Sequence, residues 1–257
     1  MVRQARERCE SCVYHIVLRG INRQDIFFDD DDYQRFLFTL EKKKSKKQFV
    51  VYGYCLMSNH VHLLIREGND GISRIMSRIG TSYAWWYNRK YDRSGHVFQG
   101  RFGSECVRDD THLLTVVRYI HNNPVKAKMV SVPEEYRWSS VRAYYGGCEH
   151  PAGLTEIEFV LAVISKNRTD AIKEFREFMK LKNEDICLDD QVKLRKTDEE
   201  VKAEIEAMMN GEPIGSMLGM ENKKRQEILK KIKNSIGVTQ RQIARITGIS
   251  PNIVFKA

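Results

Sequence analysis

Two histidines, His60 and His62, lie one residue apart inside an apolar run of the sequence. In a β-strand, residues i and i+2 point to the same face, so the two imidazoles would lie side by side while Val61 points to the other face. This spacing suits two nitrogen ligands for one cation. An isolated His-x-His pair is more often one core histidine and one surface histidine. In this chain, a second group of residues favours the metal interpretation.

The second group closes a helical pattern that begins near residues 109–111. Tyr119 and Asn123 are four residues apart, which on a helix places them on one face. Pro124 predicts that the helix stops at or just before Asn123. A tyrosine, with an ordinary pKa of ~10, becomes a nucleophile when its proton is drawn off or when a cation neutralises the group that it attacks. A cation on the histidine strand could meet the second condition.

Four segments carry recognisable motifs: 57–65 (MSNHVHLLI), 95–102 (GHVFQGRF), 118–127 (RYIHNNPVKA) and 137–140 (RWSS). They resemble the successive motifs of the single-tyrosine transposases of the IS200/IS605 type, which are HUH nucleases. Within that group, the chain looks most like the REP-associated tyrosine transposases. Each motif alone is moderately specific, but four in the family's order are hard to obtain by chance, and the resemblance covers residues 12–146.

The resemblance implies that His60 and His62 bind a divalent cation, that Asn123 is the third ligand and that Tyr119 attacks DNA. Such enzymes cut single-stranded DNA next to a hairpin, form a 5′-phosphotyrosine link and rejoin strands. Imidazole ligands alone would favour zinc, copper or nickel, whereas the family implies Mg²⁺ or Mn²⁺. Two neutral imidazoles and an amide leave the full charge of the cation available to phosphate oxygens.

The basic residues of these motifs, Arg101, Arg118 and Lys126, are expected to contact DNA. The departures from the family pattern are small. Ser58 stands where proline is usual, and residues 126–128 read Lys-Ala-Lys where Arg-Ala-Gly is usual. Neither change removes a reactive group, so the expected activity is unaffected.

Composition sets further bounds. A chain of 257 residues with a net charge of +9 allows one or two domains and suits a polyanionic partner. No apolar run reaches the roughly 18 residues of a membrane helix, and the N-terminus is too charged for a signal peptide. We therefore expect a cytoplasmic protein without a membrane partner. Cys9 and Cys12 lack a second cysteine pair for a zinc site, so free thiols are expected.

The alternation of residue types predicts an α+β fold with a ferredoxin-like split βαβ sheet. Helices should cover one sheet face and leave the histidine face for the site. The tyrosines at 83, 87 and 91 form a stripe that we interpret as core rather than as a base-stacking surface. The expected strands are 13–19, 49–57, 60–66 and about 104–107, and the expected helices are 30–47, about 72–91 and the one that carries Tyr119.

A helical C-terminal extension follows, and its charge changes along the chain. Residues 151–219 hold 10 basic and 15 acidic side chains, whereas 220–257 hold 9 and 2. We expect a nuclease domain at 1–148, a helical connector at 149–219 and a DNA-binding segment at 220–257. In the last segment, Gly248 and the Ser250-Pro251 pair fit a helix-turn-helix, with a generic helical hairpin as the alternative. The candidate DNA contacts there are Arg241, Arg245, Asn252 and Lys256.

Together these features predict a metal-dependent transposase or endonuclease that acts on single-stranded hairpin DNA, as a monomer or homodimer. The competing class is a non-catalytic DNA-binding regulator that acts through the helix-turn-helix. The presence of His60, His62, Tyr119 and Asn123 favours the enzyme, because a decayed site loses its ligands first.

Overall fold

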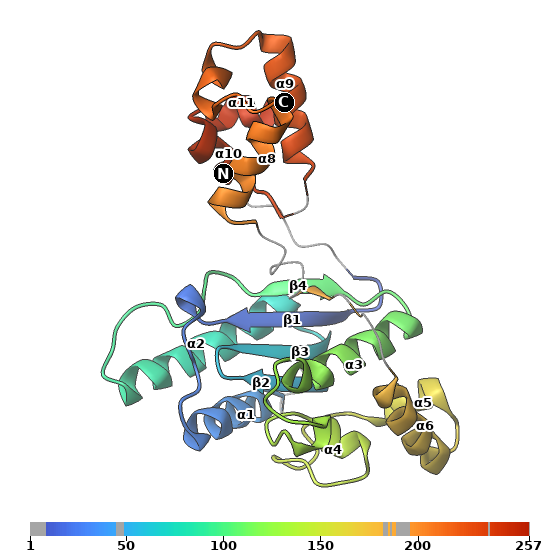
Figure 1. Ribbon diagram of the computed structural model, residues 1–257. Coiled ribbons are helices and arrows are strands. Elements are labelled where there is room, and N and C mark those ends of the chain that lie inside the picture. Colours follow the sequence, from blue (N-terminus) through green and yellow to red (C-terminus); the bar gives the residue numbers. More distant parts are fainter. Residues whose placement is uncertain are drawn as a thin grey trace. The chain divides into compact units, whose positions relative to one another are not determined.

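The computed structural model describes residues 9–44, 49–181, 185, 187–188, 196–235 and 237–256, with the side chain of residue 256 left out. The chain divides into two compact units, Met1–Leu188 and Asp189–Ala257, and each is considered by itself (Figure 1). Among the described residues, no helix is both long and apolar enough to cross a membrane.

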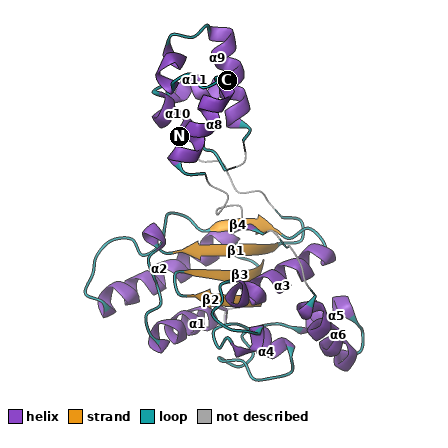
Figure 2. Cartoon of the chain, viewed as in Figure 1, coloured by secondary structure: helices purple, strands orange, loops and turns teal. Residues whose placement is uncertain are grey.

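The first unit is built on a four-stranded sheet in the order β2-β3-β1-β4, in which each neighbouring pair is antiparallel (Figure 2). One helix connects β1 to β2 and another connects β3 to β4, so the predicted α+β class and ferredoxin-like order are confirmed. The elements are β1 (Val13–Arg19), η1 (Ile21–Arg23), α1 (Asp30–Lys44), β2 (Phe49–Met57), β3 (His60–Glu67), α2 (Ile72–Lys90) and β4 (Gly103–Cys106).

The face of the sheet that carries Leu18 and Val61 is covered by α1 and α2. Leu18 pairs with Val61 and lines a groove together with residues of α2. On this side, α2 buries Tyr83 and Tyr87, and the Tyr83 hydroxyl donates to the Ile26 carbonyl. Tyr83 and Tyr87 of the stripe are therefore core, as the sequence predicts, and Tyr91 is partly buried against the same core.

The other face carries the histidines and is covered by α3 (Asp110–Lys126). The prediction of helices on one face therefore holds for α1 and α2 but not for α3. The Asp109 side chain caps α3 by accepting from the backbone N–H of His112 at 2.8 Å. The helix also continues past Pro124, against the predicted stop. Proline in the last turn removes only one backbone donor, and the Ala127 N–H still reaches the Asn123 carbonyl at 2.9 Å.

Residues after 148 do not form a separate connector. Val160, Leu161 and Phe175 are buried in the same core as the sheet. The predicted boundary at 148 is therefore wrong, because the apolar faces of the next helices pack on the first unit. These further elements are η2 (Pro133–Glu135), α4 (Val141–Tyr144), α5 (Glu158–Ile164) and α6 (Arg168–Lys180).

The second unit has its own core, which includes Val201 and Met217 of the expected connector. The predicted boundary at 219 is therefore also wrong, since residues on both sides of it fill one core. Gly248 has a φ of 70° and makes the turn between the last two helices, where the helix-turn-helix was expected. The elements are α8 (Asp198–Met208), η3 (Ile214–Leu218), α9 (Asn222–Lys233), α10 (Gln240–Thr247) and α11 (Pro251–Lys256).

Cys9 and Cys106 form a disulfide, with their Cα atoms 5.4 Å apart. The expectation of free thiols is wrong for this pair and holds for Cys12. The pairing of β1 with β4 places Tyr14 opposite Cys106, which brings the segment before β1 next to β4. A contact across 97 residues cannot be read from local spacing.

His121 is a structural histidine. It lies on α3 two residues after Tyr119, is fully buried, and its Nε2 shares a hydrogen bond of 2.8 Å with the Ser140 hydroxyl. Burial lowers the pKa of His121 to about 3, because a charged imidazole would lose its hydration there.

This depressed pKa predicts a loss of stability in acid. Below the ordinary histidine pKa of ~6.5, the unfolded chain binds a proton that the folded chain does not, so the stability due to neutral His121 is present above ~6.5 and is lost as the pH falls. Between about pH 7 and about pH 4.5, the free energy of unfolding should fall by roughly 2–3 kcal/mol more in the wild type than in His121→Gln. Urea unfolding across this pH range measures the difference, and parallel profiles for the two proteins would contradict it.

Candidate active site and DNA-binding surfaces

The two histidines of β3 face the same side of the sheet. In the register with β1, His62 pairs with Val17 and His60 pairs with Arg19. The ring centroids of His60 and His62 are 4.9 Å apart, with the ring planes at 80°. His62 is fully buried, whereas His60 is partly exposed.

Tyr119 lies across from this pair on α3. Its ring centroid is 5.8 Å from that of His62, and the side chain is 1% exposed. The Nζ atom of Lys126 lies 4.7 Å from the centre of the tyrosine ring. The structure thus brings together His60, His62, Tyr119 and Lys126, which the sequence places in two separate motifs.

Asn123 lies one helical turn after Tyr119 and is buried. Its Nδ2 donates to the Tyr119 carbonyl at 2.9 Å. This bond assigns the amide nitrogen to the helix backbone, so the amide oxygen is the atom that could ligate a cation.

The side chains available as ligands decide whether a cation fits at His60 and His62. Within the described part of the chain, no group of three His, Cys, Asp or Glu side chains is arranged to hold a metal ion. A cation at His60 and His62 would therefore need a ligand of another type, and a side-chain amide such as that of Asn123 is one. Such a set fits a divalent ion that retains water molecules and also binds phosphate oxygens.

Two residues of this site, His15 and Glu105, were not identified from the sequence. His15 is fully buried on β1, and its Nε2 lies 3.1 Å from Nδ1 of His62. Its Nδ1 lies 3.6 Å from Oε2 of Glu105 on β4. The interaction with His15 lowers the pKa of the Glu105 carboxyl, an effect that outweighs the opposing effect of burial. Only the β1–β4 register, which pairs these two residues, could have revealed them.

Arg118, a predicted DNA contact, is engaged within the protein. Its Nε and Nη2 donate to the two carboxylate oxygens of Asp185 at 2.7 and 2.9 Å. The guanidinium also lies 4.2 Å from the centre of the Phe178 ring, and the side chain is 11% exposed. A bidentate and stacked arginine is held in place by these contacts. In this structure Arg118 therefore holds Asp185 against α3, and a DNA contact by Arg118 stays a prediction.

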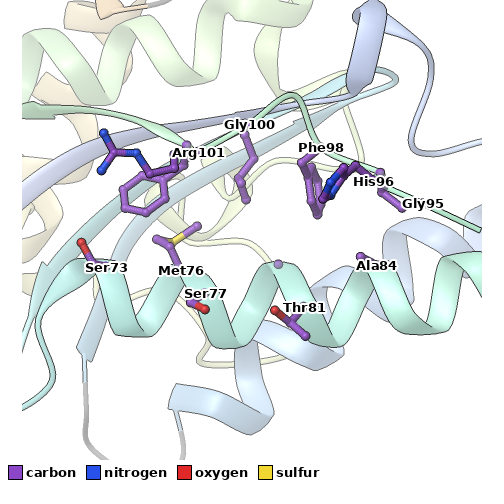
Figure 3. A pocket seen from close by; sticks show the side chains of 14 residues that line it. Ser73, Met76, Ser77, Thr81, Ala84, Gly95, His96, Phe98, Gly100 and Arg101 are labelled. Atoms are coloured by element: carbon purple, nitrogen blue, oxygen red, sulfur yellow. The ribbon is translucent and has the colours of Figure 1, made fainter. Parts of the chain in front are cut away.

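Arg101, another predicted DNA contact, is exposed at the rim of a groove of about 450 Å³. Figure 3 shows the groove between α2 and the chain segment from Gly95 to Arg101. The side chains of Ser73, Ser77 and Thr81 follow one another along the α2 side of the groove. Because α2 covers the Leu18 face of the sheet, this groove lies on the face opposite the histidines.

The remaining predicted contacts lie in the second unit. Arg241 and Asn252 are exposed. Arg245 is largely exposed but donates to Asp198 at 2.7 Å. The side chain of Lys256 lies outside the described residues.

Comparisons with known proteins agree with the sequence motifs. The family model for IS200-like transposases matches residues 8–123. A Haemophilus influenzae protein named as a REP-associated tyrosine transposase is 28% identical over 103 residues, which cover 36% of this chain and 58% of that protein. The chain therefore spans less than two thirds of the length of this curated relative.

Two solved structures are also similar. A REP-associated tyrosine transposase bound to a REP hairpin has 20% sequence identity and a TM-score of 0.48, and the match covers 62% of this chain and 90% of that one. A Deinococcus radiodurans structure described as that of a transposase has 15% identity and a TM-score of 0.33, with coverage of 47% and 97%. The family match includes the strand of His60 and His62 and extends to Asn123. The resemblance predicted from the motifs is thus confirmed by the family model, whose match is confined to residues 8–123.

Proposed function

We propose that the first unit is a metal-dependent nuclease and strand-transfer enzyme for single-stranded DNA. Tyr119 is the nucleophile, and His60, His62 and Asn123 hold Mg²⁺ or Mn²⁺. The substrate is DNA next to a hairpin, and the intermediate is a 5′-phosphotyrosine. The observation that carries this proposal is the juxtaposition of Tyr119 and His62, whose ring centroids lie 5.8 Å apart although they come from a helix and a strand.

The chemistry requires a nucleophile and charge neutralisation at one phosphate. When bound, the cation would polarise the phosphate oxygens of the scissile group. The ammonium of Lys126 lies 4.7 Å from the tyrosine ring centre and would add positive charge beside the nucleophile when a phosphate is bound. As the Tyr119 oxygen bonds to phosphorus, the bond to the 3′-oxygen breaks, which leaves a 3′-hydroxyl that can attack the same link in the reverse step.

The burial of Tyr119 adds a requirement for DNA access. The phenol is 1% exposed, and Lys126 beside it donates to the carbonyl of Asp185 at 3.2 Å. A phosphodiester needs contact with the phenol oxygen, so the proposal requires the side chains around Tyr119 to move when DNA binds.

Affinity for DNA would come from basic and amide side chains away from the chemistry. Arg101 stands at the groove beside α2, and Arg241 and Asn252 are exposed in the second unit. Contacts of this type position the substrate through its phosphates. The alternative of a non-catalytic regulator would use the second unit alone and would leave the buried constellation around Tyr119 without a role.

The nucleophile is tested by Tyr119→Phe, which removes only the hydroxyl. With hairpin single-stranded DNA and Mg²⁺ or Mn²⁺, formation of the covalent protein–DNA adduct should fall by several orders of magnitude, while folding and DNA binding persist. Denaturing gels measure the adduct. Tyr91→Phe is the control, since the Tyr91 hydroxyl donates to Asp32 on the α1 side and should not react. Adduct formation by Tyr119→Phe at the wild-type rate would exclude this nucleophile.

The cation site is tested by His60→Ala and His62→Ala. Each variant loses one of three protein ligands, so Mn²⁺ affinity should fall by at least about tenfold and cleavage should be lost. Asn123→Ala should have a milder effect, because water can replace an amide oxygen. Titration calorimetry with Mn²⁺ measures affinity directly. The control is His96→Ala, since His96 is exposed at the groove on the opposite sheet face. Unchanged affinity in both β3 variants would contradict the assignment.

DNA contact by the second unit is tested by Arg241→Gln, with Lys223→Gln on α9 as a control that removes the same charge from the same unit. Loss of one phosphate contact should lower the slope of log affinity against log salt by roughly 0.7 for single-stranded DNA or 0.9 for duplex DNA. Binding to a labelled hairpin across a salt series gives both slopes. Equal slopes for the wild type and Arg241→Gln would show that this residue does not touch DNA.

A further inference from the structure

We propose that His15 and Glu105 are positioning residues that set the protonated nitrogen of His62, so that its Nε2 is presented to the cation. This inference rests on the function proposed for His62 and extends it to two residues outside the sequence motifs. The series of contacts runs from Glu105 on β4 through His15 on β1 to His62 on β3, and the contact between the two histidines is a hydrogen bond.

The geometry of the series is specific. Nε2 of His15 lies 3.1 Å from Nδ1 of His62, a hydrogen-bonding distance between two ring nitrogens. The rings of His15 and His62 are stacked, with centroids 5.4 Å apart and planes at 21°. Nδ1 of His15 faces Oε2 of Glu105 at 3.6 Å, a distance at which the carboxylate charge attracts an N–H group although the contact is too long for a direct hydrogen bond. Both histidines are fully buried, so water does not compete for these contacts.

The proton positions follow from the need for one donor and one acceptor in each contact. If Nε2 of His62 is to bind a cation, it carries no proton, so the proton is on Nδ1 and is donated to Nε2 of His15. His15 then carries its own proton on Nδ1, which points to the Glu105 carboxylate. A carboxylate can only accept, so it stabilises this arrangement over the opposite one.

His60, the other proposed ligand, has the same arrangement of protons with Asn59 as its partner. Nδ1 of His60 lies 2.6 Å from Oδ1 of Asn59. The amide orientation is fixed because Nδ2 of Asn59 donates to the Arg23 carbonyl at 3.2 Å. The amide oxygen must therefore accept from Nδ1 of His60, which in a neutral ring places the lone pair on Nε2. Both contacts place the proton of the proposed ligand on Nδ1, although Asn59 is adjacent to His60 in sequence and His15 lies on a different strand from His62.

His15 also lies against the nucleophile. Its ring centroid is 5.9 Å from that of Tyr119, with the planes at 68°. One buried ring therefore packs against both the proposed ligand and the proposed nucleophile. A phenylalanine at position 15 would preserve this packing and remove the hydrogen bond, which separates the two roles.

The first measurement is made on the metal-free protein, so that it does not depend on catalysis. Long-range proton–nitrogen NMR of histidine-labelled protein should show His62 protonated at Nδ1, with its signals assigned by their loss in His62→Gln. In His15→Phe, a large fraction of His62 should shift to protonation at Nε2. His15→Gln should preserve the wild-type state, because its amide can accept from His62 and donate to Glu105.

The second measurement is Mn²⁺ affinity, which should fall by about 10–100-fold in His15→Phe and Glu105→Ala and be restored in His15→Gln. The control is His112→Gln, because Nε2 of His112 also faces Glu105, at 3.8 Å, but its contact is not part of the series that leads to His62. Thermal unfolding of each variant verifies that the fold persists.

The outcomes separate this inference from the function on which it rests. Protonation of wild-type His62 at Nε2, or an unchanged protonation state in His15→Phe, would overturn the inference even if the enzyme cuts DNA. The expected shift in a protein that neither binds Mn²⁺ nor forms an adduct would support the role of His15 and refute the proposed function.

Discussion

The antiparallel pairing of β1 with β3 at the centre of the sheet is the constraint on which the site depends. This register places Val17 opposite His62 and Leu18 opposite Val61. The histidine therefore lies on one face of the sheet, and Leu18 and Val61 lie on the other. A slip of one residue would turn His60 and His62 toward α2 and turn Val61 toward Tyr119. Because both faces of the sheet are covered by helices, such a slip would also bury polar groups without their partners.

A buried polar cluster of this kind is stable only when its members satisfy one another. His15, His62 and Glu105 contact one another in a linear series, and Nδ1 of His60 hydrogen bonds to Asn59. On the other side of α3, His121 has a different role, since it remains neutral and contacts Ser140. His121 follows Tyr119 by two residues and His62 faces it. The two histidines thus differ in function because they lie on different surfaces.

The second unit shows how the position of apolar residues defines a domain better than composition does. The change of net charge near residue 219 suggested a boundary, but Met217 and Leu229 belong to one core. In the first unit, Phe175 of α6 packs with Tyr144 at a ring-centroid distance of 4.8 Å. Hydrophobic burial holds these helices to their units, whereas surface charge can change along a chain without any change of fold.

The sequence by itself determined the features that depend on local periodicity. The alternation in β3 predicted that His60 and His62 share a face, and the helical spacing predicted that Tyr119 and Asn123 are neighbours. Tertiary structure decided the contacts between distant segments, namely His15 with His62, the Cys9–Cys106 disulfide, and Arg118 with Asp185. Local spacing carries no information about strand order or about which helix covers which face, because these depend on burial of apolar surface summed over the whole unit.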